Sequence, residues 1–371
     1  MTPPFRVGHA AHSDWKTATE IALKQLGTGG GKLGFMYITE DFVPYAAEML
    51  ALVKTHTGVP DWVGSVGIGI CATGTEYLDE PAVALMVCGP AGFTHAVFSG
   101  KEPPPRLGTT TASGADAAYF AIVHADPHTP DIEELIEDMA GKVSSGYLAG
   151  GLSSARGPTV QFANQVVTGG ISGVVLSSDV ALGTRLTQGC APLKTHHIIT
   201  SCDRNIISTL DERPALDVML EDLGLDMRGL RVAARDTFIG LVQPGSEASG
   251  GGDDYLVRNL TGIDPENKLI AIGDMPTIGM TMMFCKRDLQ SARGDLLRMI
   301  YDLKDDLKEP PKAALYHACI GRGASMFGEQ GAELKLIREH LGDIPLVGFF
   351  ANGEIARNRL YGYTGVLTVF K

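Results

Sequence analysis

The stretch "GICATGTEY", residues 69–77, recurs in altered form near the C-terminus as "GFFANGEIA", residues 348–356. Each copy is followed by an apolar run, "AVALMV" at 82–87 and "GVLTVF" at 365–370. A single turn of this kind, placed between apolar runs, predicts no more than a hairpin. Its recurrence indicates that a larger unit of the chain is repeated.

Three segments share one order of predicted elements. Each has an apolar strand with a polar end, a helix, a glycine-rich strand with a turn, and a return strand. The first strands of the three segments are expected at 32–41, 118–126 and 312–323. The sequence therefore predicts an α+β fold with mixed β-sheets flanked by helices, built from repeated β-α-β-β units.

The first and third copies align best through their glycines. Gly69 and Gly74 correspond to Gly348 and Gly353 in a shared G-x-x-A-[TN]-G spacing. We expect Gly74 and Gly353 to occupy equivalent turns. Elsewhere, Ser13 is the expected N-cap of an N-terminal helix, and in the second copy Thr129 is the expected N-cap of the helix.

The material between the second and third copies has a different pattern. It predicts strands over 184–213, a helix from Pro214, and a strand pair over 268–288. An amphipathic helix is expected at 289–307. The stretch 245–253 has too little apolar surface to offset its ordering entropy, so we expect it to be mobile and distant from any ligand.

Composition excludes several classes of function. The net charge of −12 argues against nucleic-acid and anionic-membrane partners, which need a basic surface. No apolar run reaches the 18 or so residues of a membrane-spanning helix, and the first residues lack a signal-peptide layout. The six cysteines form no C-x-x-C pair, which favours a reducing compartment over a zinc site or disulfide framework. We therefore expect a cytoplasmic protein.

Polar residues follow the first strand of each unit and fill the turn after its second strand. Ligands bind where such strand ends meet, so we expect one ligand-binding rim that pairs the two within each unit. The predicted ligand-binding residues are Cys71, Thr73, Glu76, Ser153, Ser154, Arg156, Cys319, Arg322, Asn352 and Glu354.

"HACIGRG" is the sharpest of these stretches. The glycines around Arg322 let backbone N–H groups approach an anion, and the arginine can hold a carboxylate with two hydrogen bonds. A nearby cation would also lower the pKa of the Cys319 thiol. The alternative is a buried structural cysteine and an arginine paired with a neighbouring helix.

The other predicted residues also have two interpretations. Ser153, Ser154 and Arg156 suit a carboxylate or phosphate, or they stabilise a hairpin. Glu76 and Glu354 are suited to bind an amino group or transfer a proton, or they cap turns. Catalytic residues cannot be assigned, because no G-x-S-x-G elbow marks a nucleophile.

The histidines form no metal-binding pattern, so no metal site is predicted. His196 and His197 adjoin in an expected strand and should point to opposite faces. His317 lies two residues before Cys319 in its strand. A lone strand histidine is more often a core residue than a haem or metal ligand.

Together these motifs resemble the FIST domain proteins (F-box and intracellular signal transduction). The resemblance rests on "LGFMYITEDF", "GVPDWVGSVGIGICATGTEY", "QGCAPL", "LDERPALDVMLEDLG", "HACIGRGASMFG" and "PLVGFFANGEIA". It implies an N-terminal arm and helix at 1–31, a FIST N-terminal domain at 32–210 and a FIST C-terminal domain at 211–371.

The resemblance implies a sensory module that binds small ligands such as amino acids. Some members bind haem to sense nitric oxide, and others recruit substrates for F-box ubiquitin ligases. We expect no cofactor here, because His317 already has an ordinary structural explanation. The chain shows no F-box, kinase or cyclase segment, so we expect signalling through a separate partner.

The sequence thus favours a small-ligand sensor for an amino-acid-like or small anionic metabolite. An enzyme such as a small-molecule amide hydrolase, using Cys319 or a turn serine, is the first alternative. A protein-interaction module is the second. The sequence leaves the ligand, the partner and the oligomeric state open.

Overall fold

The computed structural model describes residues 5–89, 94–193, 195–231, 235, 237–242 and 255–371. The stretch Gly245–Asp253, which was expected to be mobile, lies outside the described residues. The chain forms two compact units, which are described separately. The larger comprises Met1–Thr187 and Asp295–Lys371, and the smaller comprises Gln188–Gly294.

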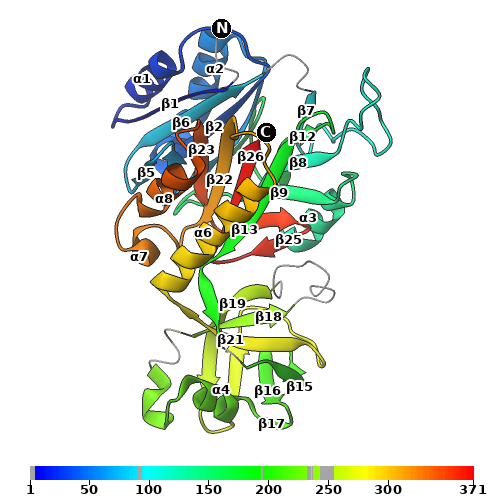
Figure 1. Ribbon diagram of the computed structural model, residues 1–371, viewed down its shortest axis with the longest axis vertical. Coiled ribbons are helices and arrows are strands. Elements are labelled where there is room, and N and C mark those ends of the chain that lie inside the picture. Colours follow the sequence, from blue (N-terminus) through cyan, green and yellow to red (C-terminus); the bar gives the residue numbers. More distant parts are fainter. Residues whose placement is uncertain (1–4, 90–93, 194, 232–234, 236, 243–254) are drawn as a thin grey trace. The chain divides into compact units, whose positions relative to one another are not determined.

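The described part of the larger unit contains three six-stranded sheets (Figure 1). Sheet A has the order β1 (Phe5–Ala11), β6 (Ala82–Cys88), β2 (Leu33–Thr39), β3 (Asp61–Gly67), β10 (Gln161–Ala163) and β11 (Val166–Val167). Sheet B has the order β13 (Leu182–Gln188), β26 (Thr364–Phe370), β22 (Ala313–Cys319), β23 (Leu346–Ala351), β4 (Gly69–Ala72) and β5 (Thr75–Leu78). Sheet C has the order β25 (Arg359–Tyr361), β24 (Glu354–Arg357), β9 (Tyr147–Leu152), β8 (Phe120–Ala125), β12 (Ile171–Leu176) and β7 (His95–Phe98).

The three sheets share one connectivity. In each, two parallel strands lie side by side, and a return strand runs antiparallel to the first of them. These triplets are β6-β2-β3, β26-β22-β23 and β12-β8-β9. The mixed sheets with flanking helices confirm the predicted α+β class. That the three segments are repeats of one unit stays a prediction.

The hairpin that follows each second strand does not stay in its own sheet. β4 pairs with β23, β10 pairs with β3, and β24 pairs with β9, so each sheet is completed by the hairpin of another segment. The sequence did not predict this exchange of hairpins, although in the third unit Cys319, Arg322 and Glu354 still lie together as expected. A hairpin edge offers backbone donors and acceptors to any sheet it reaches, and pattern alone does not name the sheet.

The glycine alignment between the first and third copies is also wrong. Gly74 lies in the turn between β4 and β5, whereas Gly353 lies between β23 and β24. The residue that matches Gly348 in its surroundings is Gly64. A Cβ on Gly64 would lie 1.7 Å from the carbonyl oxygen of Met36, and a Cβ on Gly348 would lie 1.7 Å from that of Tyr316. Both positions must therefore be glycine.

Helices cover the outer faces of the sheets. α1 (Trp15–Leu26) and α2 (Ala46–Thr57) form a hydrophobic core with sheet A, and α3 (Ile132–Ala140) forms one with sheet C. Met36 and Ile38 of β2 belong to the first core, so the alternating Phe35 and Tyr37 face the other way. Each sheet thus has an outer face toward helices and an inner face.

Two expected helix caps are placed differently. Asp14 rather than Ser13 caps α1, because its carboxylate accepts the Thr17 N–H at 2.8 Å. α3 begins after Asp131, and the Thr129 hydroxyl instead accepts the Gly170 N–H at 2.8 Å.

The described residues include no helix that is both long and apolar enough to cross a membrane.

In the smaller unit, strands close into a barrel, because β18 pairs with both β19 and β21. The strands are β14 (Cys190–Pro192), β15 (His197–Asp203), β16 (Ile206–Leu210), β17 (Arg213–Pro214), β18 (Thr237–Val242), β19 (Tyr255–Asp264), β20 (Leu269–Ile272) and β21 (Thr281–Arg287). α4 (Ala215–Leu223) packs its apolar face against the barrel core. The expected strand pair over 268–288 is wrong, since β20 pairs with β16 and β19 while β21 pairs with β14, β15 and β18.

The remaining helical elements are short except for α6. They are η1 (Glu40–Tyr45), η2 (Met227–Gly229), α6 (Leu289–Asp305), α7 (Ala324–Phe327) and α8 (Ala332–Leu341). α6 confirms the predicted amphipathic helix. α8 comes after β22, the strand that leads into the "CIGRG" stretch, and follows the short helix α7.

Candidate functional site

Three polar side chains meet on the inner faces of the sheets. Tyr37, His124 and His317 are each the fifth residue of a first strand, in β2, β8 and β22. The Tyr37 hydroxyl lies 3.1 Å from His124 Nε2 and 3.2 Å from His317 Nε2. All three are fully buried. We call them the central triad.

The central triad requires two different histidine tautomers. A tyrosine hydroxyl donates one hydrogen bond, so it donates to one imidazole and accepts from the other. In the described residues, neither His124 Nδ1 nor His317 Nδ1 has a hydrogen-bond partner. Burial lowers the pKa of His317 to about 3, and burial followed by the charge of His317 lowers that of His124. Both rings are therefore neutral at physiological pH.

The central triad does not fit haem. The Phe349 ring lies 5.4 Å from both the His317 and Tyr37 rings and 5.9 Å from the His124 ring, measured between centroids. His317 also directs Nε2 to Tyr37. A buried imidazole that contacts three aromatic rings and is bonded through Nε2 cannot present that nitrogen to a porphyrin iron.

A second buried cluster lies around Arg322. Arg322 donates from Nε to Glu333 Oε1 at 2.8 Å, and its Nη2 bonds the same oxygen. Tyr316 also donates its hydroxyl to Glu333 Oε1, at 2.5 Å. The guanidinium lies over the Phe327 ring, with its central carbon 5.2 Å from the ring centroid. The helix-paired alternative for Arg322 thus describes its observed partner, since Glu333 belongs to α8.

Glu354 and Cys319 belong to the same electrostatic environment. Glu354 is fully buried, and its Oε2 accepts hydrogen bonds from Thr364, from N–H at 3.1 Å and from the hydroxyl at 2.7 Å. Burial raises the pKa of Glu354 to about 8, against the opposing effects of these bonds and Arg322. Burial and the charge of Glu354 raise the pKa of Cys319 to about 12. The thiol therefore stays protonated despite the nearby arginine.

Glu76 approaches the cluster from the exchanged hairpin. Its Oε2 accepts the N–H of Gly331, at the start of α8, at 2.9 Å. Burial raises the pKa of Glu76 to about 7; the Gly331 bond opposes this rise, and the charge of Glu333 adds to it. Cys71, on the adjacent β4, also has a raised pKa because of burial and then the charges of Glu76 and Glu333. We call Glu76, Tyr316, Arg322, Glu333 and Glu354 the Arg322 cluster.

The Arg322 cluster has more acceptors than donors. Of the three carboxyl groups only Glu333 hydrogen-bonds the guanidinium in the described residues, and Glu76 Oε1, Glu333 Oε2 and Glu354 Oε1 are buried there without a partner. Buried carboxylate oxygens of this kind are costly unless a donor or a proton reaches them. Among the described residues, no group of three or more His, Cys, Asp or Glu side chains could hold a metal ion.

The structure brings together Cys71, Glu76, Cys319, Arg322 and Glu354 of the ten predicted residues. Their shared electrostatic interactions link them around the Arg322 cluster. Asn352, by contrast, is exposed.

The other predicted residues have structural partners. Thr73 bonds the chain before β23, donating to Ile344 O and accepting from Leu346 N, both at 3.0 Å. The Ser153 hydroxyl bonds that of Ser65 at 2.7 Å, and the Ser154 hydroxyl accepts the Ile68 N–H at 2.8 Å.

Arg156 is an exposed residue that joins two loops. It pairs with Glu40 at 2.6 Å and with Asp79. These contacts place an arginine of the second segment against the strand end of the first, as expected from the exchanged hairpins.

Sequence reasoning missed Tyr37, His124 and Glu333. Tyr37 and His124 lie within strands that read as apolar, and Glu333 lies on a helix that reads as amphipathic and solvent-facing. A usable signal was present, because Tyr37 and His317 are each the sixth residue of their predicted strands and His124 is the seventh of its own.

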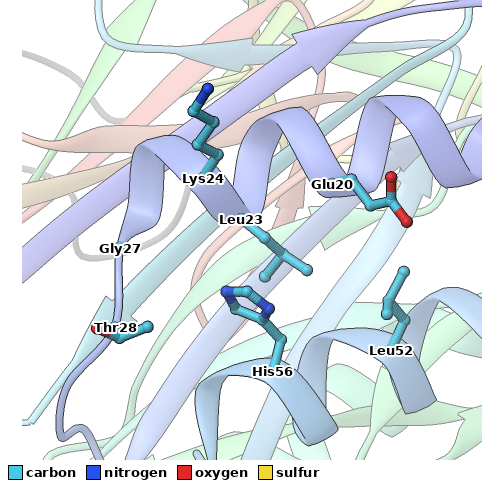
Figure 2. Close-up of a pocket in the computed structure, with 7 residues that line it drawn as sticks. All are labelled: Glu20, Leu23, Lys24, Gly27, Thr28, Leu52 and His56. Carbon is cyan, nitrogen blue, oxygen red and sulfur yellow. The ribbon is translucent and has the colours of Figure 1, made fainter.

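A separate groove of about 580 Å³ lies between α1 and α2. Figure 2 shows Leu23 of α1 and Leu52 of α2 approaching each other across it, with His56 beside them. Its other described lining residues are Glu20, Lys24, Gly27 and Thr28. The groove is distinct from the residues predicted to bind ligand.

These features define an α+β protein with a three-sheet unit, a barrel unit and buried ionisable clusters. The FIST N domain model matches residues 32–213 and the FIST C domain model matches residues 215–357, so the chain belongs to the FIST family. FIST domains are sensory domains of signal transduction that bind small ligands. The family boundary near residue 214 falls inside the smaller compact unit, so the two divisions of the chain differ.

Similar proteins occur in mycobacteria. The chain is 31% identical to "Uncharacterized protein Rv0628c" of Mycobacterium tuberculosis over 363 residues, covering 95% of this chain and 94% of that protein. It is 33% identical to "Uncharacterized protein Mb0898c" of Mycobacterium bovis over 339 residues, covering 88% and 86%. Each alignment thus spans more than four-fifths of both proteins.

Proposed function

We propose that this protein is a cytoplasmic sensor of a small amino-acid-like ligand, which binds at the Arg322 cluster and is reported to a separate signalling partner. The six cysteines are all free, as suits a reducing compartment.

The surplus of buried acceptors in the Arg322 cluster carries this proposal. An ammonium group supplies three N–H donors and one positive charge. It therefore supplies donors for the unpartnered oxygens of Glu76, Glu333 and Glu354, and its charge favours the ionised forms of Glu76 and Glu354, whose pKa values are raised. Each such charge-assisted bond contributes about 1.5–3 kcal/mol when water is excluded.

The anionic end of such a ligand requires a cation, and Arg322 is the proposed one. Its Nη1 makes a 3.4 Å contact with Tyr363 O, whereas Nε and Nη2 bond Glu333. Arg322→Ala is expected to weaken binding about ten- to a hundredfold, and Arg322→Lys to restore only part. If calorimetric titration of the folded Arg322→Ala variant gives unchanged affinity, Arg322 is structural only.

No specific observation favours the enzyme alternative. Cys319 has a pKa of about 12, so its thiolate is scarce. The turn serines, Ser153 and Ser154, are buried and engaged with Ser65 and Ile68. Turnover of a metabolite panel that is lost in Cys319→Ser would reverse this judgement.

The ligand chemistry is tested first by mass spectrometry of small molecules released from purified, denatured protein. We expect a retained compound with a primary amine. A thermal-shift panel of the standard L-amino acids then compares the natural protein with Glu354→Gln, which keeps the acceptor for Thr364 but removes the ionisable carboxyl group. An amine that raises the Tm of the natural protein alone supports the proposal. Failure of every amine in both experiments refutes it.

A further inference from the structure

His197, the first residue of β15 in the smaller unit, lies between two carboxylates. Its Nδ1 is 2.6 Å from Asp211 Oδ2 and its Nε2 is 2.9 Å from Asp222 Oδ2. The His197 side chain is 7% exposed and that of Asp222 is 11% exposed, so this contact is largely shielded from water. Asp211 follows β16, and Asp222 lies on α4, so the imidazole links α4 to two strands of the barrel.

The geometry requires a doubly protonated ring. An ionised carboxylate only accepts hydrogen bonds, and a neutral imidazole has a single N–H. Two contacts of hydrogen-bond length from both ring nitrogens to carboxylates therefore need both nitrogens to carry a proton. His197 is thus an imidazolium with one counterion on the barrel and another on α4.

Asp211 and Asp222 are the electrostatic partners of the ring, and Arg213 acts on Asp211. From β21, the uncharged Phe284 ring packs at 6.0 Å between centroids. Asp211 is held in place independently, because its Oδ1 accepts the Ile198 N–H at 2.9 Å.

Asp222 has no comparable second support. In the described part of the chain, His197 is the one residue that bonds its carboxylate. Loss of the proton from His197 leaves a nearly buried carboxylate on α4 without a cation and removes one of the two hydrogen bonds. An unpaired buried charge is strongly unfavourable, so α4 should then separate from this part of the barrel.

We propose that His197 is a proton-operated latch that fastens α4 to the barrel and releases it when the proton is lost. The latch also gives a role to the motif "LDERPALDVMLEDLG", residues 210–224, which supplies both carboxylates. It is independent of the ligand proposed for the Arg322 cluster.

The direction of the pH response follows from the electrostatics. Partial burial alone lowers the pKa of His197, but the hydrogen bonds and charges of Asp211 and Asp222 outweigh it, so the pKa is raised above 6.5. A raised folded pKa contributes stability that is complete below 6.5 and is lost as pH rises through the folded value. The latch therefore opens on the alkaline side.

The protonation state is tested by ¹⁵N NMR of the ring nitrogens. At pH 6.5 we expect both Nδ1 and Nε2 of His197 to carry protons, with resonances distinct from those of the exposed neighbour His196. A neutral His197 ring with a single N–H at that pH overturns the proposal.

The release of α4 is tested by amide hydrogen exchange over α4, corrected for the intrinsic pH dependence of exchange. In His197→Gln we expect protection at pH 6.5 to fall about ten- to a hundredfold, because a bond to a charged group is lost. In the natural protein the amides of α4 should lose the same protection from exchange only as pH rises. Equal pH profiles in the two proteins overturn the latch.

Two further variants keep the test decisive if His197→Gln does not fold. Asp222→Asn keeps an acceptor for Nε2 but removes one charge, so the release should move to lower pH. Asp217, on the same helix as Asp222, forms an ion pair with Lys268 (2.8 Å) that is more exposed to solvent. Asp217→Asn breaks this pair and should leave the pH at which α4 is released unchanged. An unmoved transition in Asp222→Asn, or an equal shift in Asp217→Asn, contradicts the proposal.

Discussion

His317 in the larger unit and His197 in the smaller one are both buried strand residues, yet they carry opposite charge states. His317 contacts a tyrosine hydroxyl, and its pKa falls to about 3. His197 contacts two carboxylates, and its pKa rises. Burial alone would make both neutral. The comparison shows that the partner of a buried histidine, rather than its exposure, decides its charge.

The same rule separates the carboxylates. Glu354 has hydroxyl and backbone partners, and its pKa rises to about 8 because burial prevails. Asp211 bonds a backbone N–H and an imidazolium, and its pKa is lowered, first by the Ile198 N–H and then by His197. Of these four groups, His317 and Glu354 of the larger unit are therefore neutral near pH 7, whereas His197 and Asp211 of the smaller unit are ionised.

The largest expected effect is on the buried ion pair of the larger unit. Glu333→Ala removes the carboxylate that hydrogen-bonds Arg322 in a fully buried position. We expect the free energy of unfolding to fall by about 3–5 kcal/mol in urea denaturation.

A double variant shows whether that cost comes from the charge. Arg322→Met with Glu333→Leu removes both partners, so the double variant should be markedly more stable than Glu333→Ala. If it is equally unstable, packing rather than an unpaired charge explains the loss.

The second effect concerns acid. Because the folded pKa of His317 is about 3, below its ordinary 6.5, folding excludes a proton that the unfolded chain binds between these values. Stability is complete above pH 6.5 and falls as pH drops, by roughly 1.4 kcal/mol per pH unit for each such histidine. At pH 4 the loss from His317 is on the order of 3 kcal/mol.

His317→Gln should lose this part of the acid dependence while His197→Gln keeps it. Urea unfolding between pH 4 and 7 measures both slopes. Identical slopes in the two variants would show that the two buried histidines do not differ as the structure indicates.

The smallest of the three effects is on the central triad. Tyr37→Phe removes the hydroxyl that serves both His124 Nε2 and His317 Nε2. We expect a loss of about 1–3 kcal/mol, because buried polar groups are left unpaired. The matched control is Tyr301→Phe, whose hydroxyl contacts His340 at an exposed site and should change stability little. If Tyr37→Phe and Tyr301→Phe lower the free energy of unfolding equally, the central triad stabilises the fold no more than an exposed contact does.

The order of strands and helices in the larger unit could be predicted from the sequence, but the sheet to which each hairpin strand belongs could not. The strands β2, β8 and β22 and the helices that follow them lie within the predicted segments. The exchange of hairpins was not predicted, because an alternating pattern states which face of a strand is buried and not which strand is its neighbour. The same limit made the 268–288 strand pair wrong.

The candidate site was partly readable for a related reason. Glu76, Arg322 and Glu354 stood out as charged residues beside glycines in turns. Glu333 did not, because a glutamate on an amphipathic helix normally faces water, and its burial depends on Arg322 arriving from another segment. Tyr37 and His124 were hidden within apolar strands for the same non-local reason.

The exchanged hairpins have a consequence for synthesis on the ribosome. Ala72 pairs with Val347, so β4 emerges long before the strand that completes its sheet exists. At about 5–20 residues per second, the delay is on the order of half a minute. During that interval the hairpin edge is open to wrong partners. The nascent chain therefore depends on late closure, because β22, β23 and β26 all lie between β13 and β4 in sheet B.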